Sequence, residues 1–253
     1  MIGVSVETPP GYERVASGGA LAVVRQAEAD DVRQMLGAGT LHALAARDAR
    51  RREYSGRRPV YGIDLPRSGT SVVVRHATHG GMLAPITRDL FVAPGRAPEE
   101  LRTAATLRDA GVPTPAVVGF ALYPARGPLV TIDVMVEEIA PAQDLADAFG
   151  GEGSDRGALI ELSAQLIAAL ARAGARHEDL NLKNILIAFD GATARPAVVD
   201  VDRVVLGVPR LVALDANLAR FSRSARKLRA RRGLPVSEAE LETLARRARE
   251  LVA

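Results

Sequence analysis

The chain has 253 residues, 47% apolar and 25% charged, which is enough to bury a core and excludes extensive disorder. It contains no cysteine and no run of about 18 uncharged apolar residues, which excludes disulfides, zinc–thiolate and iron–sulfur sites and a membrane-spanning helix. Its 33 basic and 30 acidic residues leave a net charge of +3, so the distribution of charge is more informative than its sum.

The first half of the chain is predicted to be rich in strands. Ser17-Gly18-Gly19 lies between two apolar segments and favours a hairpin turn. Gly37 and Gly39 interrupt the helical pattern of residues 29–44, so one or two short helices are expected there. Further strands are predicted at 12–15, 20–24, 58–64, 70–75, 116–122 and 129–139, and a helix at 98–110 that Gly111 ends.

Residues 130–137 alternate between apolar and more polar side chains, which is typical of a strand with one buried face. The buried face is predicted to consist of Val130, Ile132, Val134 and Val136. The partly polar face is predicted to consist of Thr131, Asp133, Met135 and Glu137.

After Pro141 the pattern changes to helices. Residues 158–173 are apolar nearly all round, which predicts a helix in the middle of a helical lobe, ended by Gly174. Two short strands, 185–189 and 197–201, are expected with an Asp190-Gly191 turn and a brief loop between them. The other predicted helices are 145–149, 210–232 and 237–252, the last with a capping box at Ser237 and Glu240.

These patterns predict an α+β fold of two lobes. Residues 1–139 form a β-rich lobe with one key helix, of which residues 1–50 are an extension. Residues 140–253 form a mainly helical lobe with a basic C-terminal helix. Because no flexible linker separates the halves, a hinge near residues 139–141 would create a cleft for a ligand.

The strongest chemical signal lies between residues 176 and 202. A polar loop bearing His177, Asp179 and Asn184 precedes a strand, a turn and a second strand that ends at Asp200. Two carboxylates and an amide oxygen are hard ligands suited to Mg²⁺ carrying phosphates. Each piece alone is common in turns, but the His-x-Asp-x-x-x-x-Asn spacing followed by this Asp is typical of the kinase catalytic loop and its metal-binding aspartate.

The chain resembles the lipopolysaccharide kinases of the protein-kinase-like superfamily, above all those that act on 3-deoxy-D-manno-octulosonic acid (Kdo). The resemblance runs from about Tyr54 to Arg232. It is carried, in chain order, by Arg75-His76 with Gly80-Gly81, Arg88-Asp89 with Phe91, Glu100-Leu101-Arg102, Gly111-Val112-Pro113-Thr114-Pro115, Glu137-Glu138-Ile139, His177 to Asn181, Asp200-Val201-Asp202, and Asp215 to Phe221 with Arg223-Ser224.

The resemblance implies a bilobal kinase-like fold, with a nucleotide-binding lobe at 1–139 and a catalytic lobe at 140–253. It also implies an ATP-dependent phosphotransferase that acts on an alcohol group with ATP and Mg²⁺ as cofactors. Asp179 would accept or orient the proton of the acceptor hydroxyl, and His177 would orient the loop by hydrogen bonding. Asn184 and Asp200 would hold Mg²⁺ on the phosphates.

The resemblance also assigns residues to the nucleotide. Arg75 would take the place of the strand lysine that grips the α- and β-phosphates, keeping its charge but changing its geometry, and Glu100 would pair with it. Backbone groups near Glu138 and Ile139 would bind adenine. Gly56 belongs to a candidate phosphate-covering turn, for which a plain hairpin turn is the equal alternative.

The acceptor is predicted to be small or surface-presented. The next helix is expected soon after Asp200 and no Ala-Pro-Glu follows, so the long segment with which protein kinases dock peptides is missing. A sugar hydroxyl of the lipopolysaccharide inner core fits, above all on Kdo. The alternatives are another small-molecule kinase of this fold, similar to the aminoglycoside phosphotransferases, and an inactive pseudokinase scaffold.

The predicted helix at 210–232 concentrates positive charge. Between residues 220 and 232 seven side chains are basic and none is acidic: Arg220, Arg223, Arg226, Lys227, Arg229, Arg231 and Arg232. They form either a solvated face or a site for an anionic partner, which is a membrane surface, the core sugar or a lipid A precursor. Nucleic acid is not expected, because aromatic side chains are not interleaved. Residues 1–15 do not resemble a secretory signal, so we expect a cytoplasmic protein, peripheral on the inner membrane if the membrane interpretation holds.

Overall fold

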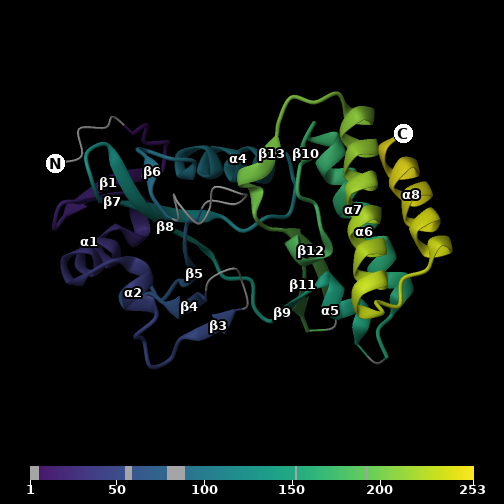
Figure 1. The fold of residues 1–253 in the computed structure, drawn as a ribbon, viewed down its shortest axis with the longest axis horizontal. Coiled ribbons are helices and arrows are strands. Elements are labelled where there is room, and N and C mark those ends of the chain that lie inside the picture. The colour runs from purple at the N-terminus through teal and green to yellow at the C-terminus, as the bar shows by residue number, and fades with distance from the viewer. Residues whose placement is uncertain (1–5, 55–58, 79–88, 152, 192) are drawn as a thin grey trace. The chain divides into compact units, whose positions relative to one another are not determined.

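The computed structural model describes residues 6–54, 59–78, 89–151, 153–191 and 193–253. The chain divides into two compact units (Figure 1). The first unit consists of Met1–Arg102 and Ala116–Glu138, and the second of Thr103–Pro115 and Ile139–Ala253. The first unit is built on an antiparallel sheet and the second is mainly helical, so the predicted α+β fold class is confirmed.

The first unit contains an eight-stranded sheet in the order β1-β2-β7-β8-β5-β4-β3, with β6 paired to β8. The strands are β1 (Tyr12–Ser17), β2 (Ala20–Arg25), β3 (Arg52–Tyr54), β4 (Val60–Asp64), β5 (Ser71–His76), β6 (Phe91–Val92), β7 (Val117–Pro124) and β8 (Leu129–Glu137). The predicted hairpin of β1 and β2 is confirmed, and Gly18 and Gly19 supply the positive φ angles that its tight turn needs.

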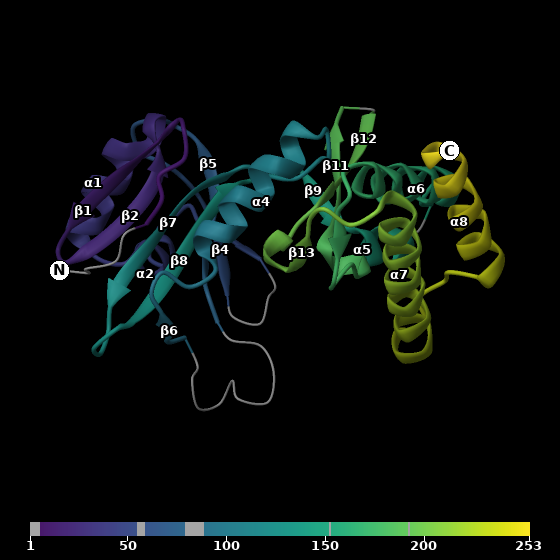
Figure 2. The same ribbon diagram turned by 90° about the horizontal axis from the view of Figure 1, so that it is seen from above.

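Helices α1 (Ala29–Ala38) and α2 (Leu41–Ala45) follow a 3₁₀ turn at Gln26–Glu28 and cover one face of the sheet (Figure 2). Gly39 separates them, as predicted, and Thr40 caps α2 by accepting a hydrogen bond from the backbone N–H of Ala43. Val32 and Leu41 of these helices share one apolar cluster with Val74 and Met135 of the sheet. The same cluster therefore holds both helices on the sheet.

The middle of β8 is buried on both faces, whereas only one buried face was predicted; the second face is partly polar, as predicted. Asp133 and Met135 are 1% and 0% exposed. Met135 packs beneath α1 and α2. The Asp133 carboxylate is paired with Nδ1 of His76 at 2.7 Å and accepts from the backbone N–H of His42 at 3.0 Å. A buried carboxylate is tolerated here because it is hydrogen-bonded to these partners.

Helix α4 (Ala97–Asp109) confirms the helix predicted at 98–110. Gly111 follows it with φ 77°, the left-handed conformation that commonly ends helices. The helix contributes to both units, because the first unit includes the chain up to Arg102 and the second begins with Thr103.

Helix α6 (Arg156–Arg172) is the central element of the second unit. It packs against α7 (Arg210–Arg232), α8 (Glu238–Val252) and the short helix α5 (Leu145–Gly150), which confirms its predicted place (Figures 1 and 2). Gly174 ends it with φ 62°. The capping box of Ser237 and Glu240 at the start of α8 is also confirmed. In the parts of the chain that the structure describes, no helix is both long and apolar enough to span a membrane.

Five short strands complete the second unit. Strands β9 (Ala142–Asp144), β11 (Ile185–Asp190) and β12 (Thr193–Val198) form a sheet in the order β12-β11-β9, and β10 (Arg176–His177) pairs with β13 (Val204–Val205). The strand predicted at 197–201 is wrong in position, because the strand begins at Thr193 and includes Pro196. Pro196 is accepted because β12 is an edge strand, whereas Val201–Arg203 form a 3₁₀ turn.

Candidate active site

The loop between β10 and β11 carries two of the predicted catalytic residues, Asp179 and Asn184, and is held by its own hydrogen bonds. The backbone carbonyl of Asp179 accepts from Nδ2 of Asn184 at 2.9 Å. The same carbonyl accepts from the backbone N–H of Asn181 at 2.8 Å, while Oδ1 of Asn181 caps the 3₁₀ turn Leu182–Asn184. The positions of Asp179 and Asn184 are therefore set by one small hydrogen-bonded turn.

Asp200 reaches the same turn from the end of β12. The backbone N–H of Val199 donates to the carbonyl of Asn184 at 2.9 Å, and Asp200 follows directly. Asp200 has φ 62° and ψ 46°, and it is the one non-glycine residue with a positive φ in the described part of the chain. That conformation costs about 1–3 kcal/mol and is found most often at functional sites. The structure thus brings Asp179, Asn184 and Asp200 together.

Asn184 and Asp200 fit a magnesium ion. Nδ2 of Asn184 is committed to the Asp179 carbonyl, and among the described residues no hydrogen bond uses its Oδ1 or the Asp200 carboxylate. Mg²⁺ is usually held by one or two carboxylate or amide oxygens, with water and phosphate oxygens at its other positions. Across the described ranges no group of three or more His, Cys, Asp or Glu side chains is placed to hold a metal ion.

His177 is buried and positions the loop. Its Nδ1 accepts from the backbone N–H of Asp179 at 3.2 Å, and its Nε2 lies 3.3 Å from the carbonyl of Val199. Burial lowers the pKa of His177, and this effect outweighs the Val199 carbonyl and the nearby carboxylates. The ring is therefore neutral at physiological pH, with its proton on Nε2, as a positioning role requires.

Helix α7 contributes three further residues whose contacts with this loop were not predicted from the sequence. Arg220 donates from Nη2 to Oδ1 of Asp179 at 2.5 Å. The buried amide of Asn217 accepts from the His177 N–H and donates to the Ala175 carbonyl, each at 2.9 Å. Ser224 Oγ accepts from the N–H of Leu182 at 3.3 Å. The available signal was their spacing of three and four residues, which puts them on one helix face.

The electrostatics of the site keep Asp179 ionised. Partial burial acts to raise the pKa of Asp179, but the hydrogen bond and charge of Arg220 oppose it. With smaller contributions from Asn181 and Arg203, the net result is a pKa below the usual value. A carboxylate that is ionised and held in place by Arg220 can orient a hydroxyl group.

The first unit provides the predicted pair of Arg75 and Glu100. Nη2 of Arg75, on β5, donates to both carboxylate oxygens of Glu100, on α4. Glu100 is 5% exposed, so its charge is buried against this partner. The pair fixes the direction of the Arg75 guanidinium, which is the arrangement expected for a phosphate-gripping residue.

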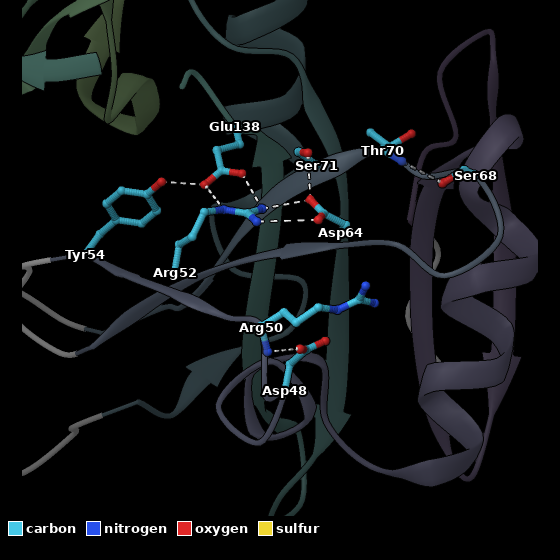
Figure 3. Close-up of polar contacts among 9 residues, drawn as sticks. All are labelled: Asp48, Arg50, Arg52, Tyr54, Asp64, Ser68, Thr70, Ser71 and Glu138. Atoms are coloured by element: carbon cyan, nitrogen blue, oxygen red, sulfur yellow. Dashed lines mark hydrogen bonds and ion pairs between the residues drawn. The ribbon is translucent and has the colours of Figure 1, made fainter. Parts of the chain in front are cut away.

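Glu138 is engaged within the first unit, which limits its predicted role in adenine binding. Its backbone N–H donates to the Ser71 carbonyl at 3.0 Å and cannot also donate to a base. Its carboxylate accepts from Nε of Arg52 at 2.7 Å and from the hydroxyl of Tyr54 (Figure 3). Adenine binding by the backbone near Glu138 and Ile139 stays a prediction. Gly56 lies outside the described residues, as do Gly80 and Gly81.

Comparison with known proteins gives one family and several relatives. Residues 42–247 match the model described as the lipopolysaccharide kinase (Kdo/WaaP) family. The chain is 36% identical over 183 residues to 3-deoxy-D-manno-octulosonic acid kinase of Stenotrophomonas maltophilia (strain K279a), covering 71% of this chain and 70% of that protein. It is 35% identical over 188 residues to the protein of the same name from Xanthomonas euvesicatoria pv. vesicatoria (strain 85-10), covering 73% and 72%.

Two solved structures were also matched. One is WaaP in complex with acyl carrier protein, with a TM-score of 0.48 and 16% identity, covering 88% of this chain and 97% of that one. The other is a Rio2 kinase–ADP/Mg²⁺–phosphoaspartate complex from Chaetomium thermophilum, with a TM-score of 0.49 and 19% identity, covering 84% of this chain and 68% of that one.

Proposed function

The chain belongs to the lipopolysaccharide kinase (Kdo/WaaP) family, and from this premise we propose that it transfers the γ-phosphate of ATP to a sugar hydroxyl of the lipopolysaccharide inner core, on Kdo. Family membership makes the chain a phosphotransferase with an alcohol group as acceptor. The observation that carries the proposal is the ionised Asp179 carboxylate, held by Arg220 beside the oxygen donors of Asn184 and Asp200.

Phosphoryl transfer depends mainly on positioning and on neutralising charge. Asp179 orients the acceptor hydroxyl and takes its proton as the oxygen attacks the γ-phosphorus and the bond to the β-phosphate oxygen breaks. Oδ1 of Asn184 and the carboxylate of Asp200 would hold Mg²⁺, which would neutralise charge on the phosphates. His177 stays neutral throughout and keeps the loop in register.

The first unit binds the nucleotide in this proposal. The guanidinium of Arg75, directed by Glu100, interacts with the α- and β-phosphates. Adenine is recognised by the carbonyl of Glu138 and by backbone groups of Ile139. Because the acceptor is a lipid-linked sugar, we infer that the enzyme works in the cytoplasm at the face of the inner membrane, where ATP is available.

The test is ATP-dependent phosphorylation of Kdo-lipid A, with free sugars and aminoglycosides as competing acceptors. We expect Mg²⁺-dependent transfer to Kdo, and a loss of about 10²-fold or more in kcat for Asp179→Asn. Asp215→Asn makes the same chemical change at an exposed position of α7 and should leave kcat unchanged. Preferred transfer to aminoglycosides would instead favour the small-molecule alternative. Failure of every acceptor would favour an inactive scaffold.

A further inference from the structure

A hollow of about 330 Å³ opens beside Asp179 in the second unit. One wall is the loop that carries Asn181 and Lys183, and the other is the face of α7 that carries Arg220, Arg223 and Lys227. The volume is within the range of sites that bind small ligands or parts of larger ones. Because Asp179 lines the hollow, whatever binds there lies against the proposed catalytic carboxylate.

The hollow carries a concentrated positive charge. Its lining contains four basic side chains and one acidic one, Asp179, to which Arg220 is committed at 2.5 Å. In the described part of the chain, no carboxylate forms an ion pair with Lys183, Arg223 or Lys227. Cations that are close together without a counter-ion repel one another, so a bound anion would relieve this repulsion.

Two other basic residues of α7 differ in this respect. Arg226 and Arg229 face α8, where both pair with Glu238, at 2.8 and 2.5 Å. The side of the helix that faces α8 is therefore partly neutralised by Glu238, whereas Arg223 and Lys227, which line the hollow, have no carboxylate partner among the described residues. A membrane surface would attract these cations anywhere on the exposed side of the helix. Their position in a concave site beside Asp179 instead favours a ligand that binds next to this carboxylate.

We propose that this hollow binds a negatively charged group of the acceptor, a carboxylate or a phosphate, and thereby holds the acceptor's hydroxyl against Asp179. Arg223 and Lys227, one helical turn apart, supply the anion contacts, and Lys183 closes the opposite wall. The inference rests on the proposed function and narrows it, since it requires an acidic or phosphorylated sugar as the acceptor.

The test compares two double variants of the full chain. Arg223→Gln/Lys227→Gln removes the two α7 cations that line the hollow, and Arg231→Gln/Arg232→Gln removes two exposed cations further along the same helix. We expect the first variant to raise the KM for detergent-dispersed Kdo-lipid A at least tenfold, with an unchanged KM for ATP. The control should leave both constants unchanged. The wild-type acceptor KM should also rise with salt more steeply than that of the first variant.

Two further acceptors identify the anion. If the rise in KM of the first variant disappears with dephosphorylated Kdo-lipid A, the hollow binds a lipid A phosphate. If the rise in KM persists, and the first variant also loses binding of free Kdo in isothermal titration calorimetry, the hollow binds the sugar carboxylate. Either result supports the proposal.

An unchanged acceptor KM in the first variant would overturn the proposal. Equal loss of binding to phosphatidylglycerol vesicles by both double variants, with normal acceptor KM, would overturn it in favour of a membrane contact. If the wild type phosphorylates no sugar, calorimetry still tests the anion site. Binding of Kdo or inorganic phosphate to the wild type and the control, but not to the first variant, would show that the hollow binds an anion even though the proposed reaction fails. Absence of any such binding would refute it as well.

Discussion

The guanidinium of Arg220 reaches Oδ1 of Asp179 at 2.5 Å across a separation of 41 residues, and so ties the proposed catalytic carboxylate to helix α7. The backbone of Asp179 is held separately, by Asn184 at its carbonyl and by His177 at its N–H. The loop therefore sets where Asp179 lies, and the helix sets the direction in which its carboxylate points. Arg220 is a positioning residue in this arrangement.

Replacing Arg220 tests that role. We expect Arg220→Gln to lower kcat for sugar phosphorylation about tenfold or more, because the carboxylate loses its charged partner, while the KM for ATP stays unchanged. Arg220→Lys should recover part of kcat, since lysine restores the charge but not the planar donor geometry. Steady-state kinetics with both substrates varied gives the answer. Equal kcat in Arg220→Gln and wild type would contradict the positioning role.

Asn217 should be important for stability. Its fully buried amide satisfies the N–H of His177 and the carbonyl of Ala175, so Asn217→Ala would leave two buried backbone groups without partners. At about 1–3 kcal/mol for each of the two unsatisfied groups, we expect the free energy of unfolding to fall by about 2–6 kcal/mol. Urea denaturation measures this. Asp215→Ala on the same helix removes only an exposed ion pair with Arg249 and should have little effect.

His76 should make stability depend on pH. Its hydrogen bond to Asp133 raises the pKa of His76, burial acts against this, and Asp89, 3.1 Å from Nε2, adds to the increase. A raised folded-state pKa stabilises the protein fully below the unfolded value near 6.5, and this contribution is lost as the pH rises through the folded-state pKa.

The measurement is the difference in free energy of unfolding between wild type and His76→Gln, from about pH 6 to about pH 9. We expect the advantage of the wild type to shrink as the pH rises. The lowered pKa of His177 produces the opposite slope, but it is present in both proteins and cancels in the difference. If the stability advantage of the wild type over His76→Gln grew with pH, the folded protein would hold His76 as the neutral ring.

Gly62 should be intolerant of a side chain. A Cβ atom at this position would collide with Oε1 of Glu138 and crowd Arg52 and Tyr54, so Gly62→Ala must displace the carboxylate shown in Figure 3. We expect a loss of about 1–3 kcal/mol in the free energy of unfolding. Gly150→Ala is the matched control, because no atom lies within 4 Å of a Cβ at that position.

The same variant has a spectroscopic readout. Burial and the hydrogen bond to Glu138 raise the pKa of Tyr54 to about 12. When Glu138 is displaced, this tyrosine should ionise at lower pH, which absorbance at the phenolate band detects among the four tyrosines of the chain. An unchanged titration with unchanged stability would mean that the cluster accommodates the methyl group.

Much of the fold was predictable because its signals are local. The helices at 98–110, 158–173 and 210–232 are long enough for their apolar period to be recognised, and glycines mark their ends. Strands β3, β6 and β9 were missed because two or three residues contain no period. Such strands form where a neighbouring strand offers hydrogen bonds, as β11 does for β9.

The amino-acid sequence by itself determined the proposed catalytic loop, because the few residues from His177 to Asn184 cannot be far apart in any fold and their spacing is typical of kinase catalytic loops. Only the tertiary structure decided the partners of α7. The apolar pattern of that helix predicts which face is buried, but it does not predict which residues the polar side chains contact. The packing of α7 against α8 places Arg226 and Arg229 beside Glu238. Its packing against the loop of Asp179 places Arg220 and Arg223 in the lining of the hollow.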